Sequence, residues 1–314
     1  MLCATPASRT VRQGCYPALM HARHFGQLIL LSALWGASFP FIRIASPAFG
    51  PWGLAWLRCA LAAAVLAAIM RTVGEQWPPR SAWPRLALLS LLTIAIPFVL
   101  FNAAGLVLPA GYSAILNATV PLFSMLGAAA MSEERLTARR LAGCLLGFVG
   151  VALLVRLGPV DASTGVVLAA LACTIASACY GVGAILMKRA MLTHQPLAAS
   201  AAAHVAAMAI LLLPLGLSVP TMRPTAEAVL AVAVLGTVTS GLMYWVSMRL
   251  LREIPATAAT SSALLIPLFG VTWGGLFLQE PVTLGMLPGA LLVLAATALI
   301  TGFNPLQRTR PRQH

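Results

Sequence analysis

Ten apolar segments run through the chain, each close to the length that a helix needs to cross a lipid bilayer. Crossing the hydrocarbon core takes about 20 apolar residues in an α-helix. A backbone in lipid must satisfy its own hydrogen bonds, and at this segment length a helix does so. A membrane β-barrel would instead show alternating segments of about ten residues, a pattern that the sequence lacks. The expected spans are residues 26–46, 51–70, 85–105, 109–130, 139–156, 163–187, 196–216, 227–248, 257–279 and 283–303.

The composition agrees with a chain that lies mostly inside a membrane. Of the 314 residues, 60% are apolar and 9% are charged, whereas about 25% of the residues of a soluble domain are charged. This composition excludes a soluble enzyme, a disordered chain and a secreted disulfide scaffold. The six cysteines form neither a CxxC pair nor a zinc-ligand pattern, so we interpret them as small apolar residues.

The net charge of +13 follows from basic residues in the loops. With the amino terminus in the cytoplasm, the segments expected inside carry sixteen Lys and Arg residues, and those expected outside carry three. Such a bias marks the cytoplasmic side of membrane proteins. The basic residues are not interleaved with aromatic ones, so no nucleic-acid partner is expected. With an Arg-, Ala- and Gly-rich composition typical of GC-rich bacteria, the sequence predicts a multi-pass inner-membrane protein with cytoplasmic tails at residues 1–25 and 304–314.

The two halves of the chain repeat each other. A shift of 146 residues aligns residues 109–154 with the second half, with thirteen identities and no gap. The aligned pairs include Pro109 with Pro255, Pro121 with Pro267, and Glu134 with Glu280. Because each half holds five spans, an odd number, the second half enters the membrane from the opposite side. The sequence therefore predicts an all-α integral membrane fold of ten transmembrane helices, in two inverted-topology five-helix repeats at 26–156 and 163–303, as in alternating-access transporters.

The residues that carry this pattern resemble a known family. The first span contains Leu34-Trp35-Gly36-Ala37-Ser38-Phe39, the second begins at Pro51 and contains Arg58, and the small-residue helix ending Pro121…Glu134 recurs as Pro267…Glu280. Over residues 26–303 the chain resembles the EamA-type members of the drug/metabolite transporter superfamily. This resemblance implies secondary transport, often export of amino acids, related metabolites or drugs. The second half departs from the pattern at Tyr180, where Trp is usual, and at Ala203 or His204, which stand near the place of Arg58.

Polar and aromatic residues inside the expected spans are candidates for solute contacts. Arg58 follows Pro51 by seven residues, and a charge inside a span usually faces a cavity or a partner. Arg58 either binds a carboxylate or phosphate of the solute or fixes its helix through backbone carbonyls. His204 either relays protons or packs between helices. The expected solute-binding residues are Trp35, Arg58, Asn102, Asn117, Tyr180, His204 and Tyr244.

Two prolines at one repeat position are expected to serve gating. Pro121 and Pro267 each remove a backbone hydrogen bond and bend their helices, and a static kink is the alternative. Glu134 and Glu280 are either helix-terminal carboxylates paired with arginines or a pseudo-symmetric gate latch. GxxxG spacings are expected to pack helices within the monomer, with a homodimer as the other use.

The sequence lacks the motifs of several classes of enzyme and of ATP-driven transporters. The sequence has no GxxxxGK[ST] loop, HExxH motif or GxSxG elbow, so neither an ATP motor nor these enzyme classes are expected. No cofactor and no metal site are expected. The sequence predicts a secondary transporter in contact with membrane lipid that exports a small organic solute, coupled to a proton or substrate gradient. An importer and a non-transporting assembly subunit are the alternatives, and a lipid-modifying enzyme would need a His, Asp or Glu cluster that we do not find.

Overall fold

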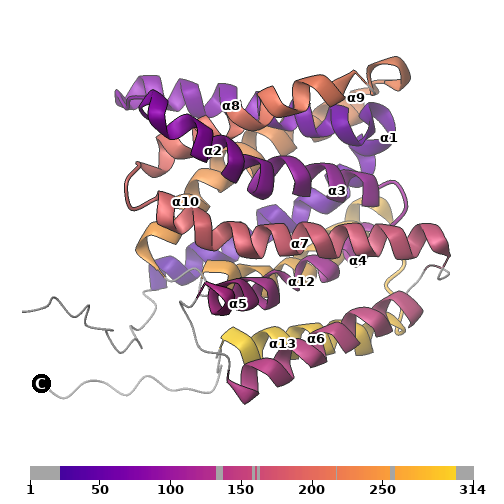
Figure 1. The fold of residues 1–314 in the computed structure, drawn as a ribbon. Coiled ribbons are helices and arrows are strands. Elements are labelled where there is room, and N and C mark those ends of the chain that lie inside the picture. The colour runs from indigo at the N-terminus through magenta and orange to yellow at the C-terminus, as the bar shows by residue number, and fades with distance from the viewer. Residues whose placement is uncertain are drawn as a thin grey trace, which may run out of the picture.

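The fold is helical throughout the described residues, which are 22–131, 137–157, 160, 163–216, 218–254 and 259–301 of a computed structural model. No strand occurs in these ranges, and the helices form one bundle (Figure 1). The α-helices are α1 (Ala22–Val73), α2 (Trp83–Ser90), α3 (Ile96–Ala104), α4 (Ala110–Asn117), α5 (Val120–Ala130), α6 (Ala138–Leu157), α7 (Thr164–Ala190), α8 (Pro196–Leu215), α9 (Ala226–Val234), α10 (Met243–Glu253), α12 (Ile266–Leu278) and α13 (Met286–Thr301). The predicted tails at 1–25 and 304–314 lie outside these ranges, apart from residues 22–25.

Six stretches are long and apolar enough to cross a membrane within the described residues. They are Gly26–Val73, Arg80–Ala104, Ala110–Ala130, Thr164–Ala190, Pro196–Leu215 and Ala226–Glu253. Shorter apolar helices cover Leu141–Gly150, Ile266–Leu278 and Met286–Ala296. The expected all-helical membrane fold is therefore confirmed at this level.

The long helix α1 consists of two helices joined at Gly50. The backbone of Gly50 has φ 69° and ψ 163°, a conformation that glycine adopts without a Cβ clash. Close by, the hydroxyl of Ser218 accepts a hydrogen bond from the Gly53 amide at 3.2 Å, and the Arg223 amide donates to the Ala48 carbonyl at 2.8 Å. These contacts hold the junction against the segment that precedes α9.

One π-helical segment interrupts the helical run in each half. Leu91–Ala95 lies between α2 and α3, and Leu235–Leu242 lies between α9 and α10. Thr93 and Thr239, which the 146-residue shift aligns, each donate a hydroxyl proton to the carbonyl four residues earlier, at 2.8 and 2.9 Å. A π-helical turn is rare and often marks a functional site.

The fourth helix of each predicted repeat is broken just before its proline. α4 ends at Asn117 and α5 begins at Val120, with Pro121 in its first turn. In the second half, α12 begins at Ile266 with Pro267 in its first turn, after the short 3-10 helix Thr260–Leu264. Proline fits a first turn because its missing N–H has no helical partner there. The two prolines therefore start helices, whereas the sequence predicted bends inside spans.

Two glycines let helices from opposite halves approach closely. A Cβ added to Gly36 of α1 would lie 2.6 Å from the Phe269 Cβ of α12. A Cβ added to Gly181 of α7 would lie 2.6 Å from the Ser124 amide nitrogen of α5. The repeat aligns these two contacts, so the first helix of each half crosses the fourth helix of the other.

Helices α6 and α13 pack mainly on each other (Figure 1). Gly150 of α6 approaches the backbone of α13, where an added Cβ would lie 2.9 Å from the Val293 amide nitrogen. Gly147 lies against Leu122 and Ala296. Gly147, which belongs to the GxxxG spacing Gly143/Gly147, therefore packs within the chain, and so does Gly150.

We predict that Gly181→Ala destabilises the protein. The added methyl group meets backbone atoms of α5 that cannot rotate away, and overpacking of this kind costs about 1–3 kcal/mol. Gly275→Ala is the matched control, because no atom lies within 4 Å of its Cβ position. Thermal unfolding of both variants in detergent tests this, and equal melting temperatures would contradict the tight crossing.

Candidate functional site

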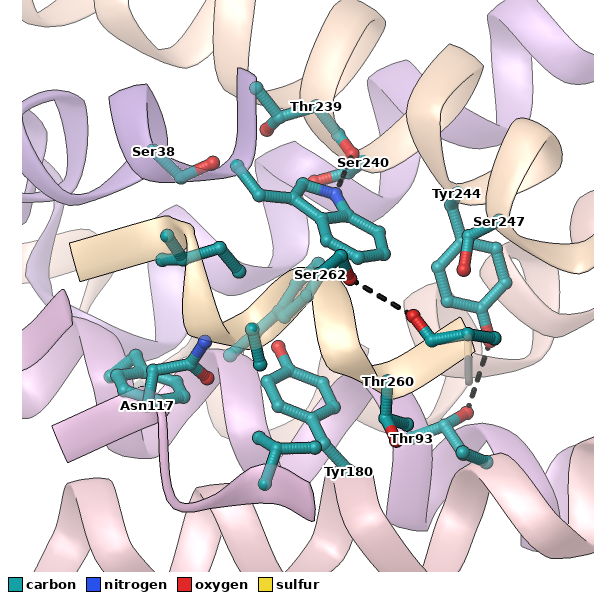
Figure 2. Close-up of a pocket in the computed structure, with 18 of the residues that line it drawn as sticks. Ser38, Thr93, Asn117, Tyr180, Thr239, Ser240, Tyr244, Ser247, Thr260 and Ser262 are labelled. Atoms are coloured by element: carbon teal, nitrogen blue, oxygen red, sulfur yellow. Dashed lines mark hydrogen bonds between the residues drawn. The ribbon is translucent and has the colours of Figure 1, made fainter. Parts of the chain in front are cut away.

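A cavity with an empty volume of about 1070 Å³ lies between helices of both halves. Its wall is formed by α1, α3, α7 and α10, by both π-helical segments, and by the residues around the two helix breaks. Figure 2 shows ten of the polar wall residues, most of which bear hydroxyl groups. These labelled residues are Ser38, Thr93, Asn117, Tyr180, Thr239, Ser240, Tyr244, Ser247, Thr260 and Ser262.

Five of the seven predicted solute-binding residues line this cavity. They are Trp35, Arg58, Asn117, Tyr180 and Tyr244. Of the predicted gating residues, neither Pro121 nor Pro267 is in the wall, but their neighbours Val120 and Ile266 are. The helix breaks that precede the two prolines therefore lie at the cavity.

Arg58 brings a buried positive charge to the wall. Its side chain is 5% exposed. Its Nε donates to the Ser240 hydroxyl at 3.2 Å, and its Nη1 donates to the Asn102 side-chain oxygen at 3.4 Å. The guanidinium carbon lies 3.8 Å from the centre of the Phe98 ring, a cation–π geometry. These neutral partners fix the guanidinium in place.

No described carboxylate neutralises Arg58. Within the described ranges, an ion pair joins His24 Nε2 to Glu253 Oε2 at 2.9 Å and does not involve Arg58. The described cavity wall holds no Asp or Glu, and Arg58 is its one charged residue. A guanidinium has five N–H donors, and the contacts above use Nε and Nη1 only. The site therefore presents an uncompensated cation and spare donors.

Asn102 and His204 lie behind the wall. Asn102 donates to the Pro51 carbonyl at 3.0 Å and accepts from Arg58. His204 is fully buried, its Nδ1 lies 2.9 Å from the Ser200 carbonyl oxygen, and its ring meets the Tyr244 ring edge-to-face at 4.7 Å. Each touches a residue of the wall, and direct solute contact by either remains a prediction.

The shift of 146 residues relates two contacts between a basic residue and a ring. It aligns Arg58 with His204 and Phe98 with Tyr244. Arg58 lies over Phe98, and His204 lies against Tyr244. The two halves thus keep one arrangement with different chemistry, since the first pair carries a fixed charge and the second pair does not.

Aromatic side chains shape the rest of the cavity. The Trp35 indole donates to the Thr239 carbonyl of a π-helical segment at 3.2 Å. The ring of Tyr180 stacks on that of Phe101, with centroids 6.0 Å apart. The hydroxyls of Thr93 and Tyr244 are 3.2 Å apart, joining the first π-helical segment to α10 (Figure 2). The result is a pocket of flat ring faces and hydroxyl groups.

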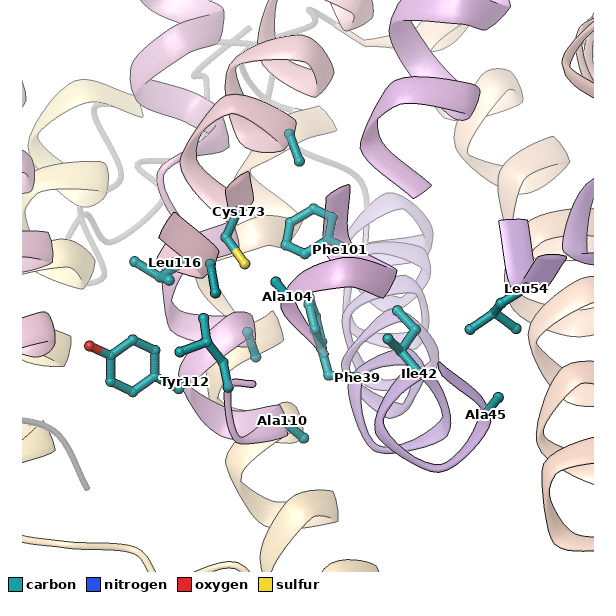
Figure 3. Close-up of a cluster of buried hydrophobic side chains, with 14 of the residues drawn as sticks. Phe39, Ile42, Ala45, Leu54, Phe101, Ala104, Ala110, Tyr112, Leu116 and Cys173 are labelled. Atoms are coloured by element: carbon teal, nitrogen blue, oxygen red, sulfur yellow. The ribbon is translucent and has the colours of Figure 1, made fainter. Parts of the chain in front are cut away.

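One end of the cavity meets a buried apolar cluster. Phe39, Ile42 and Phe101 belong both to the cavity wall and to this cluster, which continues to Leu54 and Ala110 (Figure 3). In the other direction the wall reaches Met187, Ser247 and Leu251, near the carboxyl ends of α7 and α10. Because Met187 and Leu251 belong to a second buried apolar cluster, the cavity extends between two such clusters. We call the end at Phe39 and Ile42 the cluster end.

Glu280, from the second half of the chain, lies beside the cluster end, at the amino terminus of α4. Both of its carboxylate oxygens lie 2.9 Å from the Ala110 amide nitrogen, which donates to them at the amino terminus of α4. Next to it, Gly111 and Gly270 let α4 and α12 touch, since their added Cβ atoms would lie 2.9 Å from Val271 and 2.4 Å from Ala114. Glu280 thus caps a helix and pairs with no described arginine. Its repeat mate Glu134 lies outside the described residues.

Sequence reasoning missed four wall residues that matter here. They are Phe98, Ser240, Thr93 and Thr239. Tertiary packing brings Phe98 and Ser240 against Arg58 and places both threonines in the cavity wall. The signal was present in part, because the repeat shift aligns Thr93 with Thr239 and Phe98 with Tyr244.

An apolar helical bundle around a hydroxyl-lined cavity with one described cation defines a multi-pass membrane protein with room for a small molecule. Comparison with known proteins gives the family. The EamA-like transporter family matches residues 26–156 and 166–302, and the chain belongs to this family.

Individual relatives of the chain are also named as transporters or exporters. A probable terminal-alkyne amino-acid exporter from Streptantibioticus cattleyicolor is 31% identical over 131 residues, which cover 42% of this chain and 44% of the relative. An uncharacterized transporter from Archaeoglobus fulgidus is 23% identical over 87% of this chain and 96% of its own length. A crystal structure with 18% identity has a TM-score of 0.66 over 89% of this chain and 98% of that chain, and so shares the fold. The match to the exporter spans less than half of its length.

We predict that Asn102→Ala lowers the free energy of unfolding by about 1–3 kcal/mol, because it leaves the Pro51 carbonyl and one Arg58 donor without a partner. Asn117→Ala is the control, because its side chain lines the cavity and makes no hydrogen bond to a described residue. Chemical denaturation of both variants checks this, and an equal loss of stability would contradict a supporting role for Asn102.

Proposed function

We propose that the chain is a secondary transporter that exports a small organic solute by alternating access around the cavity. The observation that carries this proposal is the cavity itself, which lies between the two halves and holds Arg58 without a described counter-charge. A buried charge in a membrane protein is costly and usually serves a solute or ion pathway. In this proposal Arg58 binds an anionic group, Trp35, Tyr180 and Tyr244 surround the solute, and Asn102, Asn117 and His204 supply hydrogen bonds.

The proposal includes ten spans in two inverted repeats at 26–156 and 163–303. Dividing Gly26–Val73 at Gly50 turns six candidate spans into seven, and the three shorter apolar helices bring the total to ten. Each short helix is near an expected span, at 139–156, 257–279 and 283–303. The proposal has both termini in the cytoplasm of a bacterial inner membrane, as the distribution of basic residues favours.

Equivalent contacts in the two halves support the repeat. In the first half, Arg43 donates to the Gly105 carbonyl at 2.9 Å. In the second half, Lys188, which the 145-residue shift aligns with Arg43, donates to the carbonyls of Leu251 and Ile254. Both basic residues thus tie the first helix of a repeat to the end of its third helix. The glycine crossings and the π-helical segments follow the same equivalence.

Gating in this proposal uses the broken fourth helices. Alternating access needs the cavity to close at one end while the other end opens. The cluster end is held by Glu280 on α4 and by the glycine contacts between α4 and α12. The breaks before Pro121 and Pro267 allow the two parts of each fourth helix to move separately. We assign the Glu280 end to the outside, opposite Lys188 and Arg252.

Two alternative functions, import and membrane assembly, place different requirements on the cavity. An importer would use the same cavity in the reverse direction, and a non-transporting assembly subunit would not need Arg58. No enzymatic activity is part of the proposal, because the described residues hold no group of three or more His, Cys, Asp or Glu that could bind a metal. For coupling to a proton gradient, His204 is the candidate in the membrane, and a substrate gradient is the alternative. A homodimer is compatible with all of these readings.

We predict that a bacterial host expressing the protein releases a metabolite that a host expressing Arg58→Ala retains. Mass spectrometry of medium and cell contents measures this, with equal membrane levels of both proteins verified. Arg85→Ala is the matched control, since Arg85 is exposed and is not part of the cavity wall. Equal release by wild type and Arg58→Ala would make Arg58 structural, and accumulation of a supplied solute inside would mean import.

We predict that Glu280→Gln loosens the cap on α4. Losing a carboxylate at a helix amino terminus costs about 1 kcal/mol, so the Ala110 and Gly111 amides should exchange with solvent about fivefold faster. Hydrogen exchange measured by mass spectrometry tests this. Glu227→Gln is the control, because Glu227 accepts no hydrogen bond from a described residue. Unchanged exchange at α4 would contradict a latch at Glu280.

A further inference from the structure

We infer that the cavity selects solutes that are net anions and discriminates against zwitterions such as free amino acids. This inference rests on the proposed function and narrows it to organic acids that carry a carboxylate or similar oxyanion without a free ammonium group. It follows from the charges, donors and ring faces at the cavity wall.

The wall offers donors for an oxyanion at one place. The Nη2 group of Arg58 makes no hydrogen bond to a described residue, and the Ser240 hydroxyl accepts from Arg58 Nε. Because Ser240 accepts in that bond, its own proton remains available to a ligand. A guanidinium and a hydroxyl side by side match the two oxygens of a carboxylate, and such charge-assisted bonds are about twice as strong as neutral ones.

The wall offers nothing that neutralises an ammonium group. In an α-amino acid the ammonium stands one carbon from the carboxylate, and a carboxylate bound at Arg58 brings it close to the guanidinium. Like charges repel strongly where water is excluded. Asn117 and the hydroxyls can accept hydrogen bonds from an ammonium group, but they carry no charge, and the described wall holds no Asp or Glu. An ammonium group would therefore exchange its hydration for neutral acceptors, with no described negative charge beside it.

Ring faces do not remove this penalty. Aromatic faces attract cations, but the face of Phe98 is already covered by Arg58 at 3.8 Å. Tyr180 stacks on Phe101, and Tyr244 meets His204. Trp35 also lines the wall, but the attraction between a ring face and a cation is modest and does not replace a counter-charge. The remaining ring surface suits an apolar or aromatic body attached to the anion.

The inference is tested with three probes that share one phenyl ring. They are 3-phenylpropionate, an anion; L-phenylalanine, which adds an ammonium to the same skeleton; and 2-phenylethylamine, which lacks the carboxylate. Binding to the purified full chain is measured by thermal stabilisation in detergent. We expect 3-phenylpropionate to bind at least about tenfold more tightly than phenylalanine, a difference of about 1.4 kcal/mol, and 2-phenylethylamine to bind weakest.

Two variants locate the selectivity. Arg58→Gln should remove the preference for the anion, and Ser240→Ala should weaken 3-phenylpropionate while leaving the charge in place. The comparison of probes on the wild-type protein needs no variant, so it stands if Arg58→Gln does not fold. Phenylalanine binding as tightly as 3-phenylpropionate overturns the inference, and so does the absence of 3-phenylpropionate binding up to its solubility.

Counterflow of labelled 3-phenylpropionate in proteoliposomes separates this inference from the proposed function. Anion-selective binding without counterflow would support the site chemistry and contradict transport. Counterflow of phenylalanine equal to that of 3-phenylpropionate would support transport and overturn the anion selectivity.

Discussion

The close crossing of helices from opposite halves is the constraint on which the rest of the structure depends. In lipid, helices gain little from apolar burial, so they associate where small residues let their backbones approach. Gly36 and Gly181 provide this at two repeat-related positions, with added Cβ atoms only 2.6 Å from the partner helix. These crossings hold the first helix of each half against the broken fourth helix of the other. The cavity lies between them because each break prevents continuous packing.

The helical segments could be predicted from the sequence because apolar length alone sets them. Expected and observed bounds agree within a few residues for segments such as 163–187, seen as α7, and 196–216, seen as α8. The interruptions were harder to predict. The two π-helical segments share no glycine or proline signal, because Leu235–Leu242 contains Gly236 and Gly241 whereas Leu91–Ala95 contains neither residue type. Thr93 and Thr239 take their places through contacts with distant helices.

The candidate site could be predicted in part, and the reason lies in the faces of the helices. Arg58 stood out because a charge in an apolar span is rare, and the aromatic residues Trp35 and Tyr180 stood out through the repeat. Its neighbours Phe98 and Ser240 come from helices far along the chain, and no spacing links them. Asn102 and His204 were expected in the wall but lie behind it, because a helix that is apolar all round does not reveal in its sequence which side faces a cavity.

The unlike pair formed by Arg58 and His204 has a consequence for how a solute would travel. If both halves carried the same cation, an anion could be handed from one half to the other during each cycle. Here the fixed charge belongs to the first half, and its counterpart in the second half is a histidine buried behind a tyrosine ring. The charged end of a solute would then stay bound to Arg58 of the first half, while the second half moves relative to it and supplies aromatic rings and hydroxyl groups such as that of Ser240.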